Sequence, residues 1–194
     1  PMCIVLAISL LVLFSAGGGS WTPFALSQLL KIIFGMAIFF IAAFSNIKTW
    51  IKSAYFIYGV ALILIILVTF IGDVGMGAQR WLSIGGVNIQ PSEFIKIALV
   101  LALARYFAWK NSVELMQFKN YLIPILILLV PFLLICAQPD LGTGISLALI
   151  TVGMFYIVGA NKKWFLIAGI LALMAAPVVW YGAMHDYQRN RIIT

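Results

Sequence analysis

The sequence predicts an all-α polytopic integral membrane protein, and its composition is the first reason. Hydrophobic residues make up 64% of the 194 residues and charged residues only 9%, with a mean hydropathy of +1.15. A soluble domain carries about 25% charged residues, so the soluble classes are excluded. The net charge of +7 does not indicate nucleic-acid binding, because the basic residues are scattered between apolar runs and are not massed on one face.

Seven apolar runs, most of them long enough to span a membrane, are the second reason. A transmembrane helix needs about 20 apolar residues, with a range of about 17–25. The expected helices span about 2–15, 28–46, 54–71, 92–109, 121–137, 143–160 and 163–184. We expect them to form a single transmembrane domain over 1–194. Because the chain opens inside an apolar run and stops in a polar segment, we also expect it to be truncated at both ends.

The basic residues predict how these helices are oriented. Links rich in Lys and Arg lie on the cytoplasmic side of a membrane. The links with two or three basic residues are 46–53, 105–120 and 160–163, and they alternate with links that have one or none. The N-terminus is therefore expected in the cytoplasm. The segments around Gly75–Lys96 and Gln138–Gly142, and the tail 185–194, are then expected on the outer face.

The longest polar interruption of the chain is the stretch Gly75–Lys96. It contains four glycines, which indicate a shaped loop before a new helix begins at Pro91. With Gln90 at the cap position, Glu93 falls at the third helical position, where a carboxylate can reach back to the cap N–H. Lys96 follows on the same helix face, one turn into an apolar segment. A charge at such a depth hints at function; the alternative is a helix cap and a lysine that extends to the interface.

The second outward-facing helix start repeats the same pattern, Gln138-Pro139-Asp140. Helix N-termini attract anions through their spare N–H groups and their dipole. Together with Arg80 and Lys96, two such starts predict an outward-facing phosphate site, and its depth favours a lipid-linked phosphate. Asp140 itself is either a catalytic or metal-binding carboxylate or, as we favour, an N-cap of the helix.

Other polar residues carry weaker indications. Arg80 beside Trp81 is read either as a phosphate contact or as an interface anchor. His185-Asp186 is expected to be solvated or interfacial. Cys3 and Cys136 lie in apolar runs without metal-ligand spacing, and are expected to be small buried hydrophobes. The sequence contains no P-loop, zinc motif, nucleophile elbow or carboxylate pair.

Four motifs resemble those of a known family. They are Gly77–Leu82, Gln90–Lys96, Ala137–Thr143 and Met184–Arg189. In this order and spacing they resemble the SEDS family (shape, elongation, division and sporulation). The Gln-Arg-Trp sequence and the His-Asp-Tyr-Gln-Arg sequence are more similar to its rod-shape members than to its division members.

The resemblance implies a ten-helix glycosyltransferase of the bacterial inner membrane. Such proteins polymerise the lipid-linked precursor lipid II into glycan strands on the outer face, during elongation and rod-shape maintenance. It implies a class B penicillin-binding protein, the elongation machinery and membrane lipids as partners. It also implies support by a divalent cation (Mg²⁺ or Mn²⁺) at an unknown site, with no organic cofactor. The reaction deprotonates an acceptor hydroxyl and releases a diphosphate, which requires a basic carboxylate and cationic stabilisation.

The resemblance also assigns roles to residues. The family's catalytic aspartate lies in an outer loop that would follow Thr194, so this chain alone is expected to be inactive. Glu93 and Lys96 are the expected supporting residues. The expected substrate-binding residues are Arg80, Lys96, Gln90 and Asp140, with Lys96 and Arg80 on the diphosphate and Glu93 orienting Lys96. Two alternatives remain: a lipid II flippase, and a non-catalytic scaffold for the penicillin-binding partner.

Overall fold

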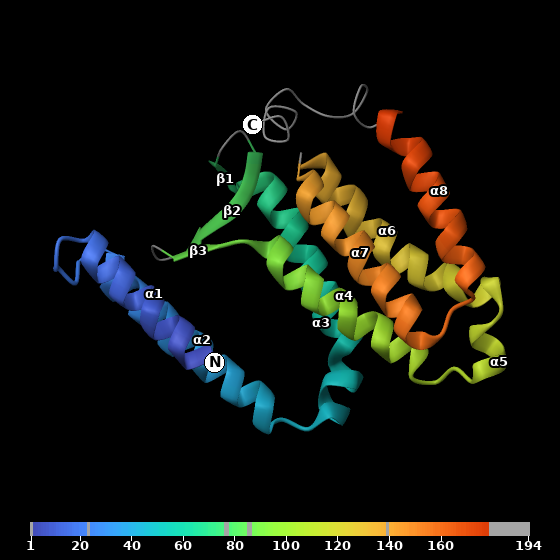
Figure 1. Ribbon diagram of the computed structural model, residues 1–194, viewed down its shortest axis with the longest axis horizontal. Coiled ribbons are helices and arrows are strands. Elements are labelled where there is room, and N and C mark those ends of the chain that lie inside the picture. Colours follow the sequence, from blue (N-terminus) through green and yellow to red (C-terminus); the bar gives the residue numbers. More distant parts are fainter. Residues whose placement is uncertain (1, 23, 76–77, 85–86, 139, 179–194) are drawn as a thin grey trace. The chain divides into compact units, whose positions relative to one another are not determined.

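The computed structural model describes residues 2–22, 24–75, 78–84, 87–138 and 140–178, which form two compact units, Pro1–Thr49 and Trp50–Thr194. Figure 1 shows the helices and strands of each unit. The helices are α1 (Met2–Ala16), α2 (Phe24–Phe44), α3 (Ile47–Ile71), α4 (Pro91–Phe107), α5 (Ser112–Leu115), the 3-10 helix η1 (Phe118–Tyr121), α6 (Leu122–Ala137), α7 (Leu141–Val158) and α8 (Lys162–Val178). The strands are β1 (Asp73–Gly75), β2 (Ala78–Ile84) and β3 (Val87–Ile89).

The seven long helices coincide with the seven predicted apolar runs. The largest difference is at α3, which begins at Ile47 and not near 54. The side chain of Asn46 accepts a hydrogen bond of 2.9 Å from the backbone N–H of Lys48. This local cap lets the helix extend into its polar first turns, which an apolar run cannot reveal. The last predicted helix is described to Val178, and 179–184 lie outside the described residues.

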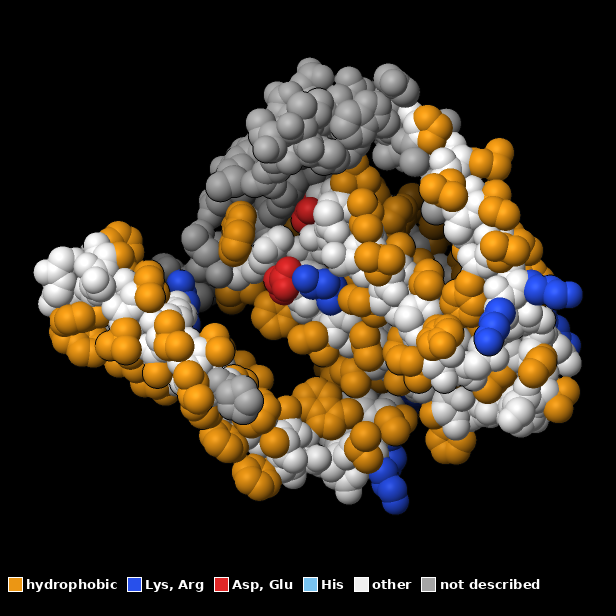
Figure 2. Space-filling model, in the orientation of Figure 1, with side chains coloured by type: hydrophobic (Ala, Val, Ile, Leu, Met, Phe, Trp, Pro, Cys, Tyr) orange, Lys and Arg blue, Asp and Glu red, His pale blue; other side chains and the backbone are white. Residues whose placement is uncertain are grey.

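Four helical segments are long and apolar enough, within the described residues, to span a membrane. They are α2, α3, η1 with α6, and α7. The other three long helices, α1, α4 and α8, have 15, 17 and 17 residues. Large hydrophobic side chains cover much of the visible surface (Figure 2), as expected for helices that face lipid.

The expected loop before α4 contains a small antiparallel sheet in the order β1-β2-β3. In the β2–β3 pair, Leu82 lies opposite Ile89 and Ile84 lies opposite Val87. The two residues between Ile84 and Val87 are both glycine in the sequence, and a Gly-Gly pair between short apolar runs is a strong hairpin signal. The fold is therefore helical with one short sheet, in a stretch predicted to be a loop.

The unit Trp50–Thr194 is built around α3, α4, α6 and α7. Its core includes Ile65, Ile95, Leu99, Ile135 and Leu147, all fully buried. The helices run back and forth through this unit (Figure 1). One end of the bundle therefore holds the sheet, the ends of α3 and α6 and the starts of α4 and α7. The other end holds the start of α3, the end of α4, α5, η1 and the start of α8.

The unit Pro1–Thr49 is a helical hairpin. Gly18 and Gly19 join α1 to α2 with φ of 66° and 80°, a region that glycine adopts without strain. Across the hairpin, Gln28 Nε2 donates a hydrogen bond of 3.4 Å to Ser9 Oγ. Lys31 lines a groove between the two helices. A lysine there can cover apolar surface with its stem while its ammonium extends to a polar boundary.

Candidate functional site

The start of α4 is the first part of the site. Gln90 is extended, with φ −105° and ψ 105°, and Pro91 is the first helical residue, as predicted. The backbone N–H of Glu93 donates to the carbonyl oxygen of Gln90 at 3.1 Å. The side chain of Gln90 makes no capping hydrogen bond. The start of α4 therefore lacks the side-chain cap that would normally occupy its free N–H groups.

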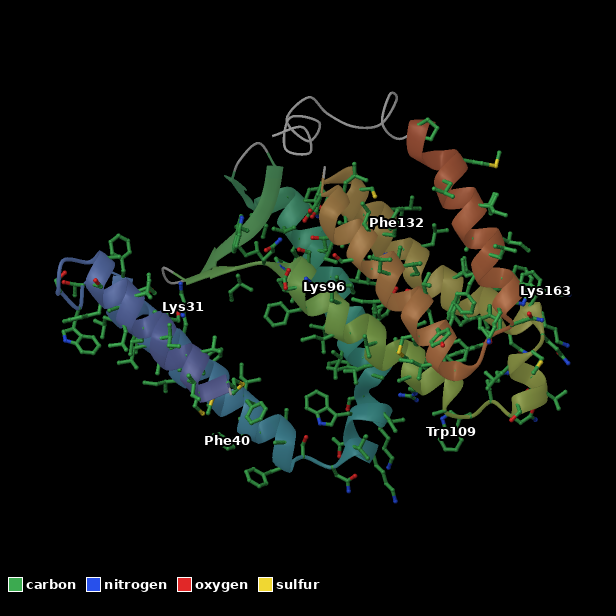
Figure 3. All side chains as sticks on the ribbon, in the orientation of Figure 1. Lys31, Phe40, Lys96, Trp109, Phe132 and Lys163 are labelled. Carbon is green, nitrogen blue, oxygen red and sulfur yellow. The ribbon has the colours of Figure 1, made fainter. Side chains whose placement is uncertain are left out.

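An ion pair between Lys96 and Glu93 lies on the first turns of α4. Lys96 Nζ donates to Glu93 Oε1 at 2.7 Å, and the two side chains are 28% and 58% exposed (Figure 3). The structure confirms the predicted pairing. An ion pair this exposed contributes only about 0–1 kcal/mol to stability. The pair therefore has little importance for the fold, and its charges remain accessible to a ligand.

Ser92 is a residue of this site that sequence reasoning missed. Its side chain is 6% exposed, and its Oγ has no hydrogen-bond partner in the described part of the chain. Buried polar atoms are nearly always hydrogen-bonded, so an exception asks for an explanation. A ligand oxygen at the start of α4 would supply that partner. The burial of Ser92 depends on how α4 packs, and no sequence pattern predicts it.

Arg80 is placed on β2 by its backbone. Asp73 lies opposite Trp81 and Val74 opposite Gln79, so Arg80 is the extra residue of a bulge between β1 and β2. Bulges often re-aim a side chain next to a functional site. Because β3 leads directly into α4, β2 runs beside the start of that helix. The side chain of Arg80 lies outside the described residues, so its contact with phosphate stays a prediction.

Gly72 fixes the junction between α3 and this sheet. A Cβ atom at Gly72 would overlap the carbonyl oxygen of Val68 and would lie 3.3 Å from that of Trp81. The overlap with Val68 lies within the last turn of α3, so this tight helix end requires a glycine, and β2 passes close to it. This close approach positions the strand that carries Arg80.

The start of α7 differs from that of α4 because a side chain caps it. Asp140, 8% exposed, is the N-cap of α7 and accepts hydrogen bonds from Thr143 N at 3.4 Å and from Thr143 Oγ1 at 2.8 Å. The N-cap interpretation is confirmed, and a role of Asp140 in substrate binding stays a prediction. Its carboxylate oxygens already have partners in the protein.

Gln138 does not repeat the role of Gln90, which corrects our expectation of equivalent helix starts. Gln138 ends α6 and is buried. Its Nε2 donates to the carbonyl oxygen of Ile65 at 2.9 Å and to Thr69 Oγ1 at 2.8 Å. The side chain therefore ties α6 to α3. Pro139, His185 and Asp186 lie outside the described residues.

The described residues do not by themselves form a metal site. Over 2–22, 24–75, 78–84, 87–138 and 140–178, no group of three or more His, Cys, Asp and Glu side chains comes together. Both cysteines are free. Cys136 is partly buried, but Cys3 is exposed, so the expectation of a buried residue is wrong for Cys3.

The sequence is similar to a family of known proteins over its whole length. Residues 1–194 match the family model FtsW/RodA/SpoVE, described as cell cycle protein. Peptidoglycan glycosyltransferase MrdB of Escherichia coli K12 is 36% identical over 191 residues, which cover 97% of this chain and 50% of that protein. The probable peptidoglycan glycosyltransferase FtsW of Haemophilus influenzae is 33% identical over 170 residues, covering 88% and 43%. The chain thus spans about half the length of these curated relatives.

Solved structures have the same fold. A chain of a peptidoglycan synthase complex superposes with a TM-score of 0.81 at 26% identity, covering 98% of this chain and 55% of that one. A mutant of the rod shape determining protein RodA of Thermus thermophilus gives a TM-score of 0.71 at 26% identity, covering 89% and 56%. The full-length match to the family model and the agreement of fold lead to one conclusion: this chain belongs to the FtsW/RodA/SpoVE family of polytopic membrane proteins, the SEDS family.

Proposed function

We propose that the whole protein is a peptidoglycan glycosyltransferase that polymerises lipid II during cell elongation and rod-shape maintenance. Its curated relatives are named peptidoglycan glycosyltransferase or probable peptidoglycan glycosyltransferase. The single observation that carries the proposal here is the start of α4. There an uncapped helix N-terminus, the hydroxyl of Ser92, which has no partner among the described residues, and the ammonium of Lys96 lie within the first two turns.

These groups suit the diphosphate that leaves in glycan transfer. Negative charge grows on the diphosphate oxygens as the glycosidic bond breaks, and fixed donors aimed at that charge lower the barrier. The ammonium of Lys96 supplies a full positive charge. The first turn of α4 supplies the positive end of the helix dipole. The residue that deprotonates the acceptor hydroxyl is proposed to lie beyond Thr194, as the family resemblance implies.

Glu93 has a positioning role in this proposal. Its carboxylate holds Lys96 Nζ at 2.7 Å at the start of α4. A lysine side chain has four rotatable bonds, and holding its ammonium in place avoids an entropic cost when the substrate binds. We assign Gln90 and Arg80 as further substrate contacts, since one precedes α4 and the other lies on the neighbouring strand.

The distribution of polar groups favours chemistry at one face over transport across the membrane. Three of the four buried polar side chains described, Ser92, Gln138 and Asp140, lie at the same end of the bundle. The fourth, Thr151, donates its hydroxyl to the carbonyl oxygen of Leu147 within its own helix. A flippase would need polar groups through the depth of the membrane. We place the site on the outer face of the inner membrane, and the N-terminus in the cytoplasm, from the basic links of the sequence.

The proposal includes a partner and a cation. One structural neighbour is a chain of a peptidoglycan synthase complex, and we propose a class B penicillin-binding protein of the elongation machinery as partner. We also propose that Mg²⁺ or Mn²⁺ supports the activity. Removing divalent cations with EDTA should stop polymerisation, and adding back one of the two should restore it.

The test uses the whole protein, purified with its penicillin-binding partner and supplied with labelled lipid II. Moenomycin is present to suppress contaminating classical polymerases, and glycan strands are read on a gel. Lys96→Ala should remove the strands. The matched control is Lys110→Ala, because Lys110 also pairs with a glutamate, Glu114, at 3.4 Å, but at the opposite end of the bundle. Near-normal strands from Lys96→Ala would overturn the site. Lipid II transfer across proteoliposomes without any strands would instead make the protein a flippase.

A further inference from the structure

A groove between α6, α7 and α8 lies away from the site described above. Its volume is about 380 Å³, within the range of about 300–1,000 Å³ that is common for ligand sites. Aliphatic and aromatic side chains form almost all of its lining, with Leu128 from α6, Phe155 from α7 and Trp164 from α8 among them. Only two lining residues, Tyr121 and Thr151, carry a hydroxyl.

Both hydroxyls are already used within the protein. Tyr121 donates to the carbonyl oxygen of Leu115 at 2.7 Å, and Thr151 donates to that of Leu147 at 3.0 Å. Neither proton is available to a ligand. A polar molecule inside the groove would lose its hydrogen bonds to water without replacement, which costs free energy. The groove therefore suits a hydrocarbon chain.

One end of the groove meets a cluster of positive charge. The rings of Phe118 and Trp164, both lining residues, lie with their centroids 4.6 Å apart and join η1 to the start of α8. Lys119 and Lys163 are their direct neighbours in the chain, and Lys162 begins α8. Figure 2 shows basic side chains gathered where α8 begins, and Figure 3 labels Lys163 among them.

The protein compensates this positive charge only in part. The one acidic residue described at this end, Glu114, pairs with Lys110 at 3.4 Å, accepts a hydrogen bond from Asn111 N at 3.0 Å and also attracts the charge of Lys119. Lys119, Lys162 and Lys163 form no salt bridge among the described residues, and all three side chains are exposed. An anion at this end would therefore meet three ammonium groups that form no salt bridge in the described structure, of which Lys119 is partly compensated by Glu114.

We propose that the groove binds an anionic diacyl phospholipid from the leaflet on this basic side of the membrane. One acyl chain lies in the groove, and the phosphate of the head group lies against Lys119, Lys162 and Lys163. Basic pockets between transmembrane helices commonly bind anionic lipid head groups, and the Phe118–Trp164 pair suits the level of the interface. This site is independent of the proposed glycosyltransferase site, which lies at the opposite end of the bundle.

The test uses the whole protein in phosphatidylcholine nanodiscs that contain a minority of spin-labelled phosphatidylglycerol. Electron paramagnetic resonance then measures the fraction of labelled lipid that the protein immobilises, and spin-labelled phosphatidylcholine is the comparison. Lys162→Gln and Lys163→Gln should each lower the preference for phosphatidylglycerol about fivefold at low salt, and less at high salt. The control Lys52→Gln removes an exposed lysine of the same side, on α3 and outside the groove.

A second pair of variants tests the groove itself. Ala168→Phe places a ring in the groove and should abolish the preference for phosphatidylglycerol, whereas Leu166→Phe, at a 68% exposed residue outside the lining, should not. Ala148→Leu fills the groove from α7 if the α8 variant fails to fold. Equal immobilisation of the two lipids would overturn the proposal. A preference for phosphatidylglycerol that survives both filling variants would also overturn it, because the anionic lipid would then bind outside the groove.

Discussion

The starts of α4 and α7 lie at the same end of the bundle, and they treat their helix ends in opposite ways. At α7, Asp140 is buried and accepts two hydrogen bonds from Thr143. At α4, the side chain of Gln90 caps nothing, and the buried hydroxyl of Ser92 has no partner among the described residues. Both starts contain Gln-Pro in the sequence, Gln90-Pro91 and Gln138-Pro139. The start of α7 is therefore capped by its own side chain, whereas at the start of α4 the hydroxyl of Ser92 has no partner among the described residues.

The difference shows why a helix N-terminus alone does not define a binding site. Both helices have a positive dipole end and free N–H groups at their first turn. At α7 a carboxylate already occupies that position and adds a negative charge, so a phosphate would be repelled. At α4 the carboxylate of Glu93 forms an ion pair with Lys96. Only α4 offers unused donors together with a cation.

The two glutamines give the largest expected difference in stability. Gln138→Leu would remove two hydrogen bonds, one of them fully buried, between α6 and α3. Thr69 Oγ1 would still donate to the carbonyl oxygen of Ile65 at 3.1 Å, so neither group is left unpaired. Each lost hydrogen bond contributes about 0.5–1.5 kcal/mol, so the melting temperature of the purified protein should fall clearly. The matched variant Gln90→Leu should leave it nearly unchanged. Equal effects of the two variants would contradict the distinction between the two helix starts.

The second largest effect on stability is expected from Asp140, the capping carboxylate of α7. Asp140→Ala removes the N-cap and should lower the free energy of unfolding by about 0.5–2 kcal/mol. Asp140→Asn keeps a capping oxygen and should restore most of this loss. Melting temperature and yield from the membrane would measure it. If Asp140→Asn keeps the stability but abolishes polymerisation, Asp140 binds substrate or takes part in catalysis, and the start of α7 is not closed.

A substitution of Ser92 should reduce polymerisation and leave stability nearly unchanged, the reverse of the effect expected for Asp140. Ser92→Ala removes a hydroxyl that has no partner in the described structure, so the stability should stay within about 0.5 kcal/mol of the parent protein. A hydrogen bond to a charged group contributes about 1.5–3 kcal/mol, so polymerisation should fall by about tenfold or more. Ser92→Cys, of similar size, controls for packing. Normal polymerisation by Ser92→Ala would show that the α4 start does not use this donor.

The parts of the site that sequence could predict are those that depend on neighbours in the chain. Pro91 at the helix start and the Glu93–Lys96 pair, three residues apart, follow from helix geometry alone. The partners of Gln138 lie 73 and 69 residues away, and the burial of Ser92 depends on packing, so neither was visible. The sheet was visible in principle, through the two glycines between Ile84 and Val87, but the pattern was read as an irregular loop.

The start of α5, at the opposite end of the bundle, is a third helix start to compare with those of α4 and α7. The effect expected there, a lowered pKa of Glu114, is the smallest of those predicted. Asn111 accepts from Glu114 N at 2.9 Å, and Glu114 accepts from Asn111 N at 3.0 Å, which closes this start reciprocally. The hydrogen bond from Asn111 N, with help from the charges of Lys110 and Lys119, lowers the pKa of Glu114 below its usual value.

Because the pKa of Glu114 is lower in the folded protein than in the unfolded chain, its ionised form stabilises α5 at neutral pH. This contribution is lost as the pH falls through the folded-state pKa. A carbon-13 NMR titration of the Glu114 carboxyl group should therefore give a pKa below that of a free glutamate. Asn111→Ala leaves the backbone N–H that lowers this pKa but removes the reciprocal bond that holds it in place, so the pKa should move part of the way back. A pKa at or above the ordinary glutamate value in the parent protein would mean that this start is open in solution, and that closure by local side chains is peculiar to α7.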